Sequence, residues 1–270
     1  MHERERWQVI KAMLKQQQLV RITDVCRATG ASEASVRRDF ARLAEVGAAI
    51  RVRGGLEVMP GAQSGSSDAP SLATRSFEIS KTLNVAAKRA IARTAVSLCS
   101  DGDAIIINGG TTTYQMGEFL RERRLKVLTN SYPLAETLIH TSHCRVALPG
   151  GEVYREQKLI VSPFEEDAFQ HYSASRMFMS AISIGPLGVI EGDPLIARAE
   201  SKLLKRAEKL VVLADSSKFT PRGSLVVCPL ARISLLITDA DAPKQALDML
   251  SDAGVEVMIA AETSDEVAAA

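Results

Sequence analysis

The chain has 270 residues, a net charge of +1 and 46% hydrophobic residues, but only 4% aromatic residues. This length holds one large domain or two of ordinary size, with a mainly aliphatic core. Because there is no apolar run of about 18 residues or more, we expect no transmembrane span, and the charged N-terminus lacks the apolar stretch of a signal peptide. We therefore expect a cytoplasmic protein.

The first part of the chain predicts two short helices, followed by a sharp turn and a third helix. Apolar residues at helical spacing mark the first two: Trp7, Ile10 and Leu14 over roughly residues 3–16, then Ile22, Val25 and Cys26 in a helix that starts near Arg21 or Thr23. Gly30 stands where the chain must turn sharply, a position suited to a positive φ.

The segment Ala31–Leu43 predicts a third helix with two different faces. Val36, Phe40 and Leu43 share one face and can pack inward, and Ser32 is a candidate N-cap. The outward residues are Ser35, Arg37, Arg38 and Arg42. A small helix with an apolar floor and a basic outer face suits the major groove of DNA.

A hairpin is expected after this helix. Gly47 supplies a helix stop, and Ala48–Val58 predicts two strands joined by a turn at Gly54-Gly55. Arg51 and Arg53 on the hairpin are placed to touch phosphate or the minor groove. Three helices and a hairpin make a winged helix-turn-helix.

Charge is distributed unevenly along the chain. Residues 1–60 hold 11 Lys and Arg against 7 Asp and Glu, whereas the remainder holds 22 against 25. The alternative to DNA binding is a small helical cap with a solvated basic face, since most runs of charge are solvated. A basic head on a mildly acidic body favours DNA binding.

The motif Ser35–Leu43, followed by Gly47 and a Gly-Gly wing, resembles the DNA-binding signature of DeoR-type bacterial transcriptional regulators. The resemblance implies that Ser35, Arg37 and Arg38 face DNA and that Asp39 orients a neighbouring arginine. The full set of candidate DNA-binding residues is Ser32, Ser35, Arg37, Arg38, Arg42, Arg51 and Arg53.

Small and polar residues over Pro60–Ser71 are typical of a linker. We expect a DNA-binding domain over 1–59, a linker over 60–72, an α/β domain over 73–262 and a flexible tail over 263–270. The alternative is a long surface loop within one domain, but the change of charge at the same point favours a boundary.

Beyond the linker, an amphipathic helical pattern over Leu83–Leu98 precedes apolar runs that alternate with helical segments. The expected strands are Ala104–Asn108, Lys126–Asn130, Arg145–Leu148, Met177–Ile184, Leu210–Ala214, Leu235–Thr238 and Val255–Ile259. The expected helices are Thr113–Arg121, Pro133–His140, Arg198–Glu208 and Pro243–Ala253. This alternation predicts an α/β fold with a mostly parallel sheet covered on both faces.

In such a sheet, ligands bind where strands lead into helices. Three polar loops occupy such positions, at 108–113, 129–133 and 149–154. The first combines two glycines with threonine hydroxyls, which suits a phosphate, and Glu152 in the third offers a carboxylate to sugar hydroxyls. The candidate effector-binding residues from these loops are Asn108, Gly110, Thr111, Thr112, Thr113, Thr129, Asn130, Ser131, Gly151 and Glu152.

These loops, together with Ala214–Phe219, look like successive motifs of the DeoR-type effector domain, which is similar in fold to ribose-phosphate isomerases and glucosamine-phosphate deaminases. The resemblance implies recognition of a phosphorylated sugar or related metabolite, with Thr111 to Thr113 at the phosphate and Lys218 supplying positive charge. An exposed turn lysine is the alternative for Lys218. Asn108 and Leu187 replace carboxylates of the family pattern, which alters the hydroxyls that are recognised.

Cofactors and metals are not expected. The chain has no Walker or G-x-G-x-x-G pattern, which disfavours a nucleotide cofactor. His140, His143 and Cys144 lie close in sequence but lack the further ligand of a structural zinc site. The four scattered cysteines are expected to be reduced thiols.

The expected function is a DNA-binding transcriptional regulator that represses a carbohydrate-catabolism operon under control of a phosphorylated sugar. We expect a dimer or tetramer, associated with the nucleoid when bound to operator DNA. The alternative is a sugar-phosphate isomerase or deaminase with a basic appendage, but the changes at Asn108 and Leu187 remove candidate acid/base groups. An architectural DNA binder fits poorly, since it needs no large α/β body.

Overall fold

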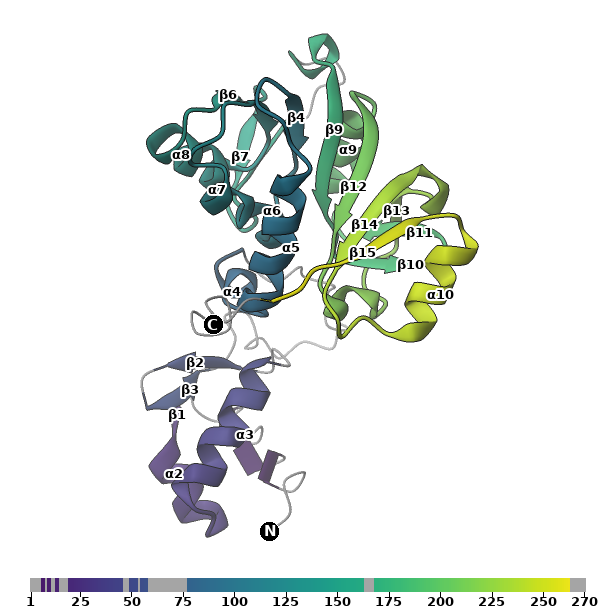
Figure 1. The fold of residues 1–270 in the computed structure, drawn as a ribbon. Helices are drawn as coiled ribbons and strands as arrows, with labels where there is room; N and C mark the ends of the chain where they lie inside the picture. Colours follow the sequence, from purple (N-terminus) through teal and green to yellow (C-terminus); the bar gives the residue numbers. More distant parts are fainter. Residues whose placement is uncertain are drawn as a thin grey trace. The chain divides into compact units, whose positions relative to one another are not determined.

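The structure is a computed structural model that describes residues 6–7, 9–10, 13–14, 19–45, 49–52, 54–57, 77–162 and 168–262. The chain divides into two compact units, Met1–Ser71 and Leu72–Ala270 (Figure 1). The division falls within the predicted linker. That linker, the predicted tail at 263–270, Gly47 and Arg53 lie outside the described residues.

The N-terminal unit contains the predicted helices. Positions 6, 7, 9, 10, 13 and 14 are helical, followed by α2 (Ile22–Thr29) and α3 (Glu33–Glu45). Gly30 ends α2 with a φ of +68°, which confirms the predicted turn. The predicted inward residues form one core, in which Ile10, Leu14, Val25, Val36, Phe40 and Leu43 are all buried, together with Leu56 from the hairpin.

The predicted wing is present, but its turn was placed one residue late. β2 (Ile50–Val52) pairs antiparallel with β3 (Gly55–Glu57), and Val52 faces Gly55, so Gly55 belongs to the strand. A third strand, β1 (Leu19–Arg21), was not predicted and pairs with β3. Gly55 permits this pairing, because a Cβ there would lie 2.8 Å from the carbonyl oxygen of Val20.

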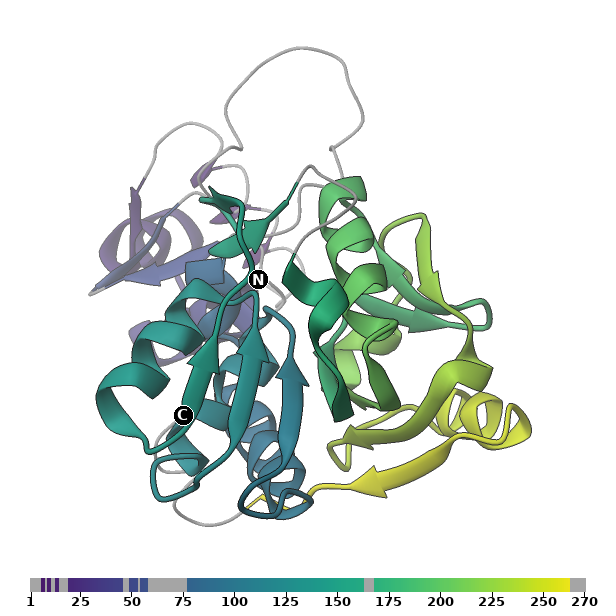
Figure 2. The ribbon, with the colours of Figure 1, turned by 90° about the horizontal axis from the view of Figure 1, so that it is seen from above.

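The C-terminal unit is built on a seven-stranded parallel sheet, as predicted. Its strand order is β15-β14-β12-β9-β4-β5-β6. The strands are β4 (Ala104–Ile107), β5 (Lys126–Thr129), β6 (Arg145–Ala147), β9 (Ala174–Ser180), β12 (Ala207–Leu213), β14 (Ile233–Thr238) and β15 (Glu256–Ile259). The arrowheads of β4, β5 and β6 point the same way in Figure 2. The chain runs outward from β4 on one side and from β9 on the other, so the order reverses between these two strands.

Helices cover both faces of this sheet, and alternate strand residues feed two separate cores. Ile105 and Ile107 pack with α5, α7 and α8, whereas Ile106 packs with α9 and α10. The helices described in this unit are α4 (Phe77–Lys81), α5 (Val85–Ser97), α6 (Thr111–Tyr114), α7 (Met116–Phe119), α8 (Tyr132–Thr141), α9 (Pro194–Leu204) and α10 (Lys244–Asp252). The 3-10 turns described are η1 (Ala168–His171), η2 (Ser216–Phe219) and η3 (Leu230–Arg232).

Two small antiparallel sheets were not predicted. One contains β10 (Ser183–Gly185), β11 (Gly188–Glu191) and β13 (Leu225–Cys228), and the other is the hairpin of β7 (Glu152–Tyr154) and β8 (Leu159–Val161). Their strands have three or four residues each, which is too short for a clear alternating pattern. The predicted strand Met177–Ile184 was wrong, because this range begins inside β9, which ends at Ser180, and extends into β10, which begins at Ser183.

Two predicted helices had wrong boundaries. The predicted Arg198–Glu208 begins four residues late and runs into β12, because Asp193 caps α9 through its Oδ1, which accepts from the backbone N–H groups of Leu195 and Ile196. The predicted Thr113–Arg121 is two short helices, α6 and α7, and begins at Thr111. Among the helices described, none is long and apolar enough to cross a membrane.

Candidate functional site

The outer face of α3 carries the predicted DNA-binding residues. Ser32, Arg37, Arg38 and Arg42 are exposed and Ser35 is half-buried, while the opposite face is sealed in the core. The Ser32 hydroxyl accepts a hydrogen bond of 3.3 Å from the backbone N–H of Ser35, as expected of an N-cap. Arg37 forms an exposed ion pair of 3.3 Å with Glu33 one turn earlier. The helix therefore presents a hydroxyl and three guanidinium groups on one surface.

A cavity lies between α3 and the hairpin of β2 and β3, and two of the predicted DNA-binding arginines line it. Its lining includes Arg37 from α3 and Arg51 from β2, over the apolar side chains of Phe40 and Val52. Arg51 is exposed. α3 and β2 thus each contribute a positively charged side chain to the lining of this cavity.

Asp39 lies on the inner side of α3 and was expected to orient a neighbouring arginine. Its carboxylate accepts hydrogen bonds from Arg6 Nε at 2.7 Å and from Trp7 Nε1 at 3.2 Å. The arginine is therefore on the first helix, and Asp39 fixes α3 to it.

The second candidate site lies at the point where the strand order of the parallel sheet reverses, which is where such sheets bind ligands. A cavity that opens to solvent lies there. Its lining comes from the residues after β4 and β9, from α4, from the β7–β8 hairpin, and from α9 and η2. The polar lining residues are Ser80, Thr111, Thr112, Gln157, Ser180, Glu191, Glu200 and Lys218.

Four predicted effector-binding residues line this cavity: Gly110, Thr111, Thr112 and Lys218. Gly110 is required by packing, because a Cβ there would clash with the Cβ of Ser180. The predicted loop after β4 therefore contributes to the cavity wall.

The other predicted residues do not line the cavity. Asn108 and Thr113 lie beneath it: the Thr113 hydroxyl donates to the Asn108 carbonyl at 2.9 Å. Asn130 accepts from the Gly109 backbone N–H at 2.8 Å and so supports the loop from the side. Thr129 and Ser131 organise the turn into α8, since Thr129 Oγ1 accepts from the Ser131 N–H and Ser131 caps the helix. Gly151 and Glu152 are exposed at the β7–β8 hairpin.

Two buried carboxyl groups in the cavity wall were missed by the sequence analysis. Glu191 ends β11, and Glu200 lies on the buried face of α9. Burial raises the pKa of Glu200 well above its usual range, and Glu191 adds to that shift while a hydrogen bond from Asn108 opposes it. Burial also raises the pKa of Glu191, although hydrogen bonds from the backbone N–H groups of Gly192 and Asp193 act to lower it. The sequence did carry a signal for the burial of Glu200, because this acid shares the helical spacing of the apolar residues Ile196 and Leu203.

Lys218 belongs to η2 and lies near the buried carboxylate of Asp215. Burial alone would raise the pKa of Asp215, but Lys218, Lys88 and hydrogen bonds from Ser217 and Asn84 outweigh it, so the pKa is lowered. Asp215 is therefore a buried anion that balances the positive charge beside the cavity.

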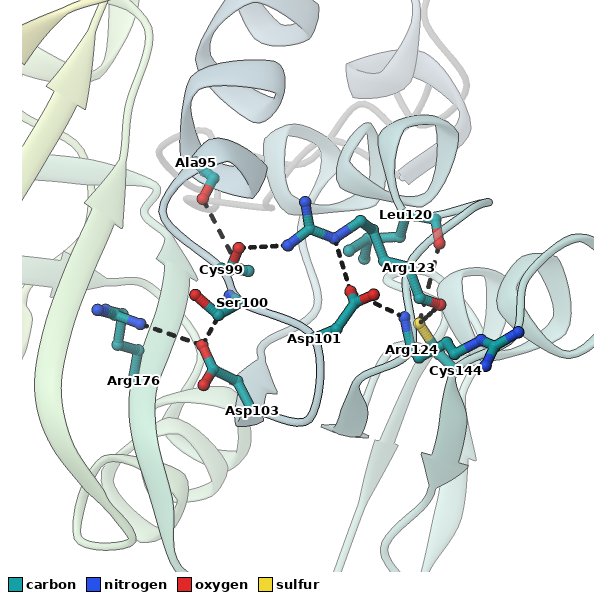
Figure 3. A network of polar contacts seen from close by, with 10 residues as sticks. All are labelled: Ala95, Cys99, Ser100, Asp101, Asp103, Leu120, Arg123, Arg124, Cys144 and Arg176. Atoms are coloured by element: carbon teal, nitrogen blue, oxygen red, sulfur yellow. Dashed lines mark hydrogen bonds and ion pairs between the residues drawn. The ribbon is translucent and has the colours of Figure 1, made fainter.

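Cysteine side chains line neither of the two cavities. All four cysteines are free thiols. Figure 3 shows that Cys99 and Cys144 lie on either side of Arg123, whose guanidinium donates to the Cys99 carbonyl and, at 3.0 Å, to Asp101. Burial raises the pKa of the Cys99 thiol to about 11. Within the described ranges, no group of three or more His, Cys, Asp or Glu is arranged to hold a metal ion.

Comparison with known proteins matches both units. The family model described as the DeoR-like helix-turn-helix domain matches residues 6–60, and that described as the DeoR C terminal sensor domain matches residues 83–240. The HTH-type transcriptional regulator UlaR of Shigella dysenteriae serotype 1 is 31% identical over 258 residues, covering 96% of this chain and 99% of its own length. UlaR of Escherichia coli O127:H6 is 32% identical with the same coverage.

Solved structures match only part of the chain. Ribose 5-phosphate isomerase A from Methanocaldococcus jannaschii has a TM-score of 0.36 and 19% identity, covering 49% of this chain and 53% of its own. eIF2B beta from Chaetomium thermophilum has a TM-score of 0.42 and 14% identity, covering 67% and 55%. The chain thus spans about half the length of these structures, and nothing about function follows from likeness at this level.

Proposed function

The chain belongs to the DeoR family of helix-turn-helix transcriptional regulators, and from this premise we propose which signal controls it and how. It is a DNA-binding regulator of transcription. The alternative of an isomerase or deaminase is not favoured, because the relatives that match along almost the whole chain are named transcriptional regulators.

The DNA interface that we propose is the outer face of α3 together with the wing. Ser32, Ser35, Arg37, Arg38 and Arg42 face the major groove, where guanidinium groups recognise guanine edges and hydroxyls contact bases or phosphates. Arg51 from β2 contacts the backbone, and Arg53 is assigned to the same role from the sequence. The buried contacts of Asp39 hold α3 at a fixed angle for this docking.

The controlling ligand that we propose is a phosphorylated sugar bound in the cavity between the ends of β4 and β9. The observation that carries this proposal is the chemistry of the wall: Lys218 and the hydroxyl-bearing Thr111 and Thr112 suit a phosphate, while Glu191 and Glu200 offer oxygens to sugar hydroxyls. A ligand with an anionic end and a hydroxyl-rich end satisfies both groups. Asn108, Thr113 and Asn130 then support the loop that carries the threonines.

Control requires the ligand to bind two states of the protein with different affinity. A coupling of about 1–3 kcal/mol changes operator affinity roughly 5–150-fold. In the proposed function, a cytoplasmic dimer or tetramer represses a carbohydrate-catabolism operon on the nucleoid, and the sugar phosphate shifts it between states that do and do not fit the operator.

The test of the ligand class uses the whole chain in the absence of DNA. Thermal-shift measurements with a panel of sugar phosphates and their unphosphorylated parents should show stabilisation by one phosphorylated compound, because ligand binding to the native state raises stability by mass action. Lys218→Gln should abolish this shift, and Lys205→Gln, an exposed lysine after α9, should preserve it. Equal shifts with the unphosphorylated sugars, or none with any compound, would contradict the proposed ligand class.

A further inference from the structure

The helix α4 contributes directly to the wall of the effector cavity. Phe77 and Ser80, from this helix, both line it. The Phe77 ring packs edge-on against Tyr114 at a centroid distance of 5.4 Å, and its backbone N–H donates to the Glu156 carbonyl at 3.0 Å. α4 therefore lies between the loop after β4 and the β7–β8 hairpin.

This helix depends on its neighbours for its position. It has five residues, which is too short to be stable on its own in water. The buried ammonium group of Lys88, on α5, donates to the carbonyls of Ser80 at 2.7 Å and Leu83 at 2.5 Å. One of these carbonyls belongs to the last turn of α4 and the other to the turn that follows it, where backbone carbonyls lack helical partners. Lys88 therefore fixes α4 against α5, and the two helices lie side by side in Figure 1.

The same cluster connects to the cavity through Asp215. Asn84, with a left-handed φ of +50°, occupies the N-cap position of α5, and its side-chain amide donates to Asp215 Oδ1 at 3.0 Å instead of capping the helix. Asp215 is 1% exposed, and both Lys88 and the cavity residue Lys218 stabilise its charge. An anion bound at Lys218 would therefore change the balance of charge at Asp215, to which the side chain of Asn84 is hydrogen-bonded.

The position of α4 in the chain links the contacts of Lys88, Asn84 and Asp215 to the DNA-binding domain. It is the first element described after β3, so the segment that leads back to the DNA-binding domain starts at α4. We propose that the turn between α4 and α5, held by Lys88 and Asn84, is the element that couples the effector cavity to the DNA-binding domain. Lys88 and Asn84 are positioning residues in this scheme and contact neither DNA nor ligand.

The inference rests on the proposed function and has a test that needs no identified ligand. Because coupling is reciprocal, binding of DNA must also alter the α4–α5 turn. Hydrogen–deuterium exchange of the full-length chain is measured free and bound to a duplex that the chain selects from a random pool. Amides of residues 77–88 should change their exchange rates roughly fivefold or more on duplex binding, whereas those of β14, which lies next to the edge strand β15 and does not line the cavity, should not.

Three variants separate coupling from stability. Lys88→Met removes the ammonium group, and Asn84→Gly keeps the left-handed backbone without strain but loses the amide that donates to Asp215. Both should reduce the duplex-induced change at least severalfold, while the control Lys126→Met, at an exposed lysine that begins β5, should retain it. Asn84→Gly provides the result if Lys88→Met does not fold.

The outcomes are distinguishable. Unchanged exchange over 77–88 in the duplex-bound wild type, or an equal change in Asn84→Gly, would overturn the coupling role and leave the proposed function standing. Failure to select any duplex would overturn the proposed function and this inference with it.

Discussion

The side-chain amide of Asn108 donates a hydrogen bond of 2.7 Å to Glu200 Oε1, joining the end of β4 to the buried face of α9. The amide oxygen of Asn108 accepts from the Ser180 backbone N–H at 2.8 Å, so this side chain links three elements beneath the cavity. A carboxylate at position 108 could not donate to Glu200. The amide at position 108 is therefore matched to its two partners, since it donates to Glu200 and accepts from Ser180.

Asn108→Asp should destabilise the C-terminal unit by about 1–3 kcal/mol at neutral pH, because two buried carboxyl groups would then compete for one proton. Urea denaturation measures this loss. Adding Glu200→Gln to the variant should restore most of the stability, since the new amide can donate to the carboxylate introduced just after β4. No recovery in the double variant would show that the loss has another origin.

The raised pKa of Glu200 predicts a pH dependence of stability in the wild type. The folded state holds this proton more tightly than the unfolded state, so the stabilisation is complete below the unfolded pKa and is lost as the pH rises through the folded pKa. Glu200→Gln should flatten that decline at pH values above the ordinary pKa of a glutamate, as measured by urea denaturation at a series of pH values. Glu136→Gln, an exposed acid on α8, should leave the slope as it is. An unchanged slope in Glu200→Gln would show that the folded protein holds this carboxyl ionised.

The contact between Asp39 and Arg6 predicts a loss of stability that is transmitted to DNA binding. The side chains are 3% and 15% exposed, and removing one partner of such a pair leaves the other uncompensated, at a cost of about 3–5 kcal/mol. Asp39→Ala should therefore reduce amide protection in α3, measured by hydrogen exchange, and weaken DNA binding. Arg38→Ala, by comparison, should weaken DNA binding with protection preserved. Equal protection in both variants would contradict the role assigned to Asp39.

The sequence predicted the elements whose patterns are long and local. The stripe of Val36 and Phe40 on α3 and the apolar strands of the parallel sheet other than β9 were predicted to within a few residues, because helical and strand periodicities leave a direct trace in residue order. The three-residue strands, such as β1, leave no such trace. Asp193 and Pro194 did signal the start of α9, but the predicted helix began later.

The candidate cavity was only partly predictable for a related reason. The loop carrying Thr111 and Thr112 follows a strand and is visible in the sequence, whereas Glu191 and Glu200 reach the cavity from elements much further along the chain. Their convergence depends on where the strand order reverses, and residue spacing does not encode that. Similarly, the partner of Asp39 lies on another helix and could not be assigned from α3 alone.

The two arginines at the rim of the cavity between α3 and the wing should have different effects on DNA binding. Arg51→Ala removes a proposed phosphate contact, so it should weaken binding to all sequences equally and reduce the salt dependence by about one released ion. Arg37→Ala removes a proposed base contact, so it should cost about 1–3 kcal/mol on the selected site and relax discrimination between sites. Fluorescence anisotropy at several salt concentrations, with selected and scrambled duplexes, separates the two effects, and Arg121→Ala in the other unit serves as the control. If Arg51→Ala changed discrimination while Arg37→Ala left it intact, the assignment of α3 to base recognition and the wing to the backbone would be reversed.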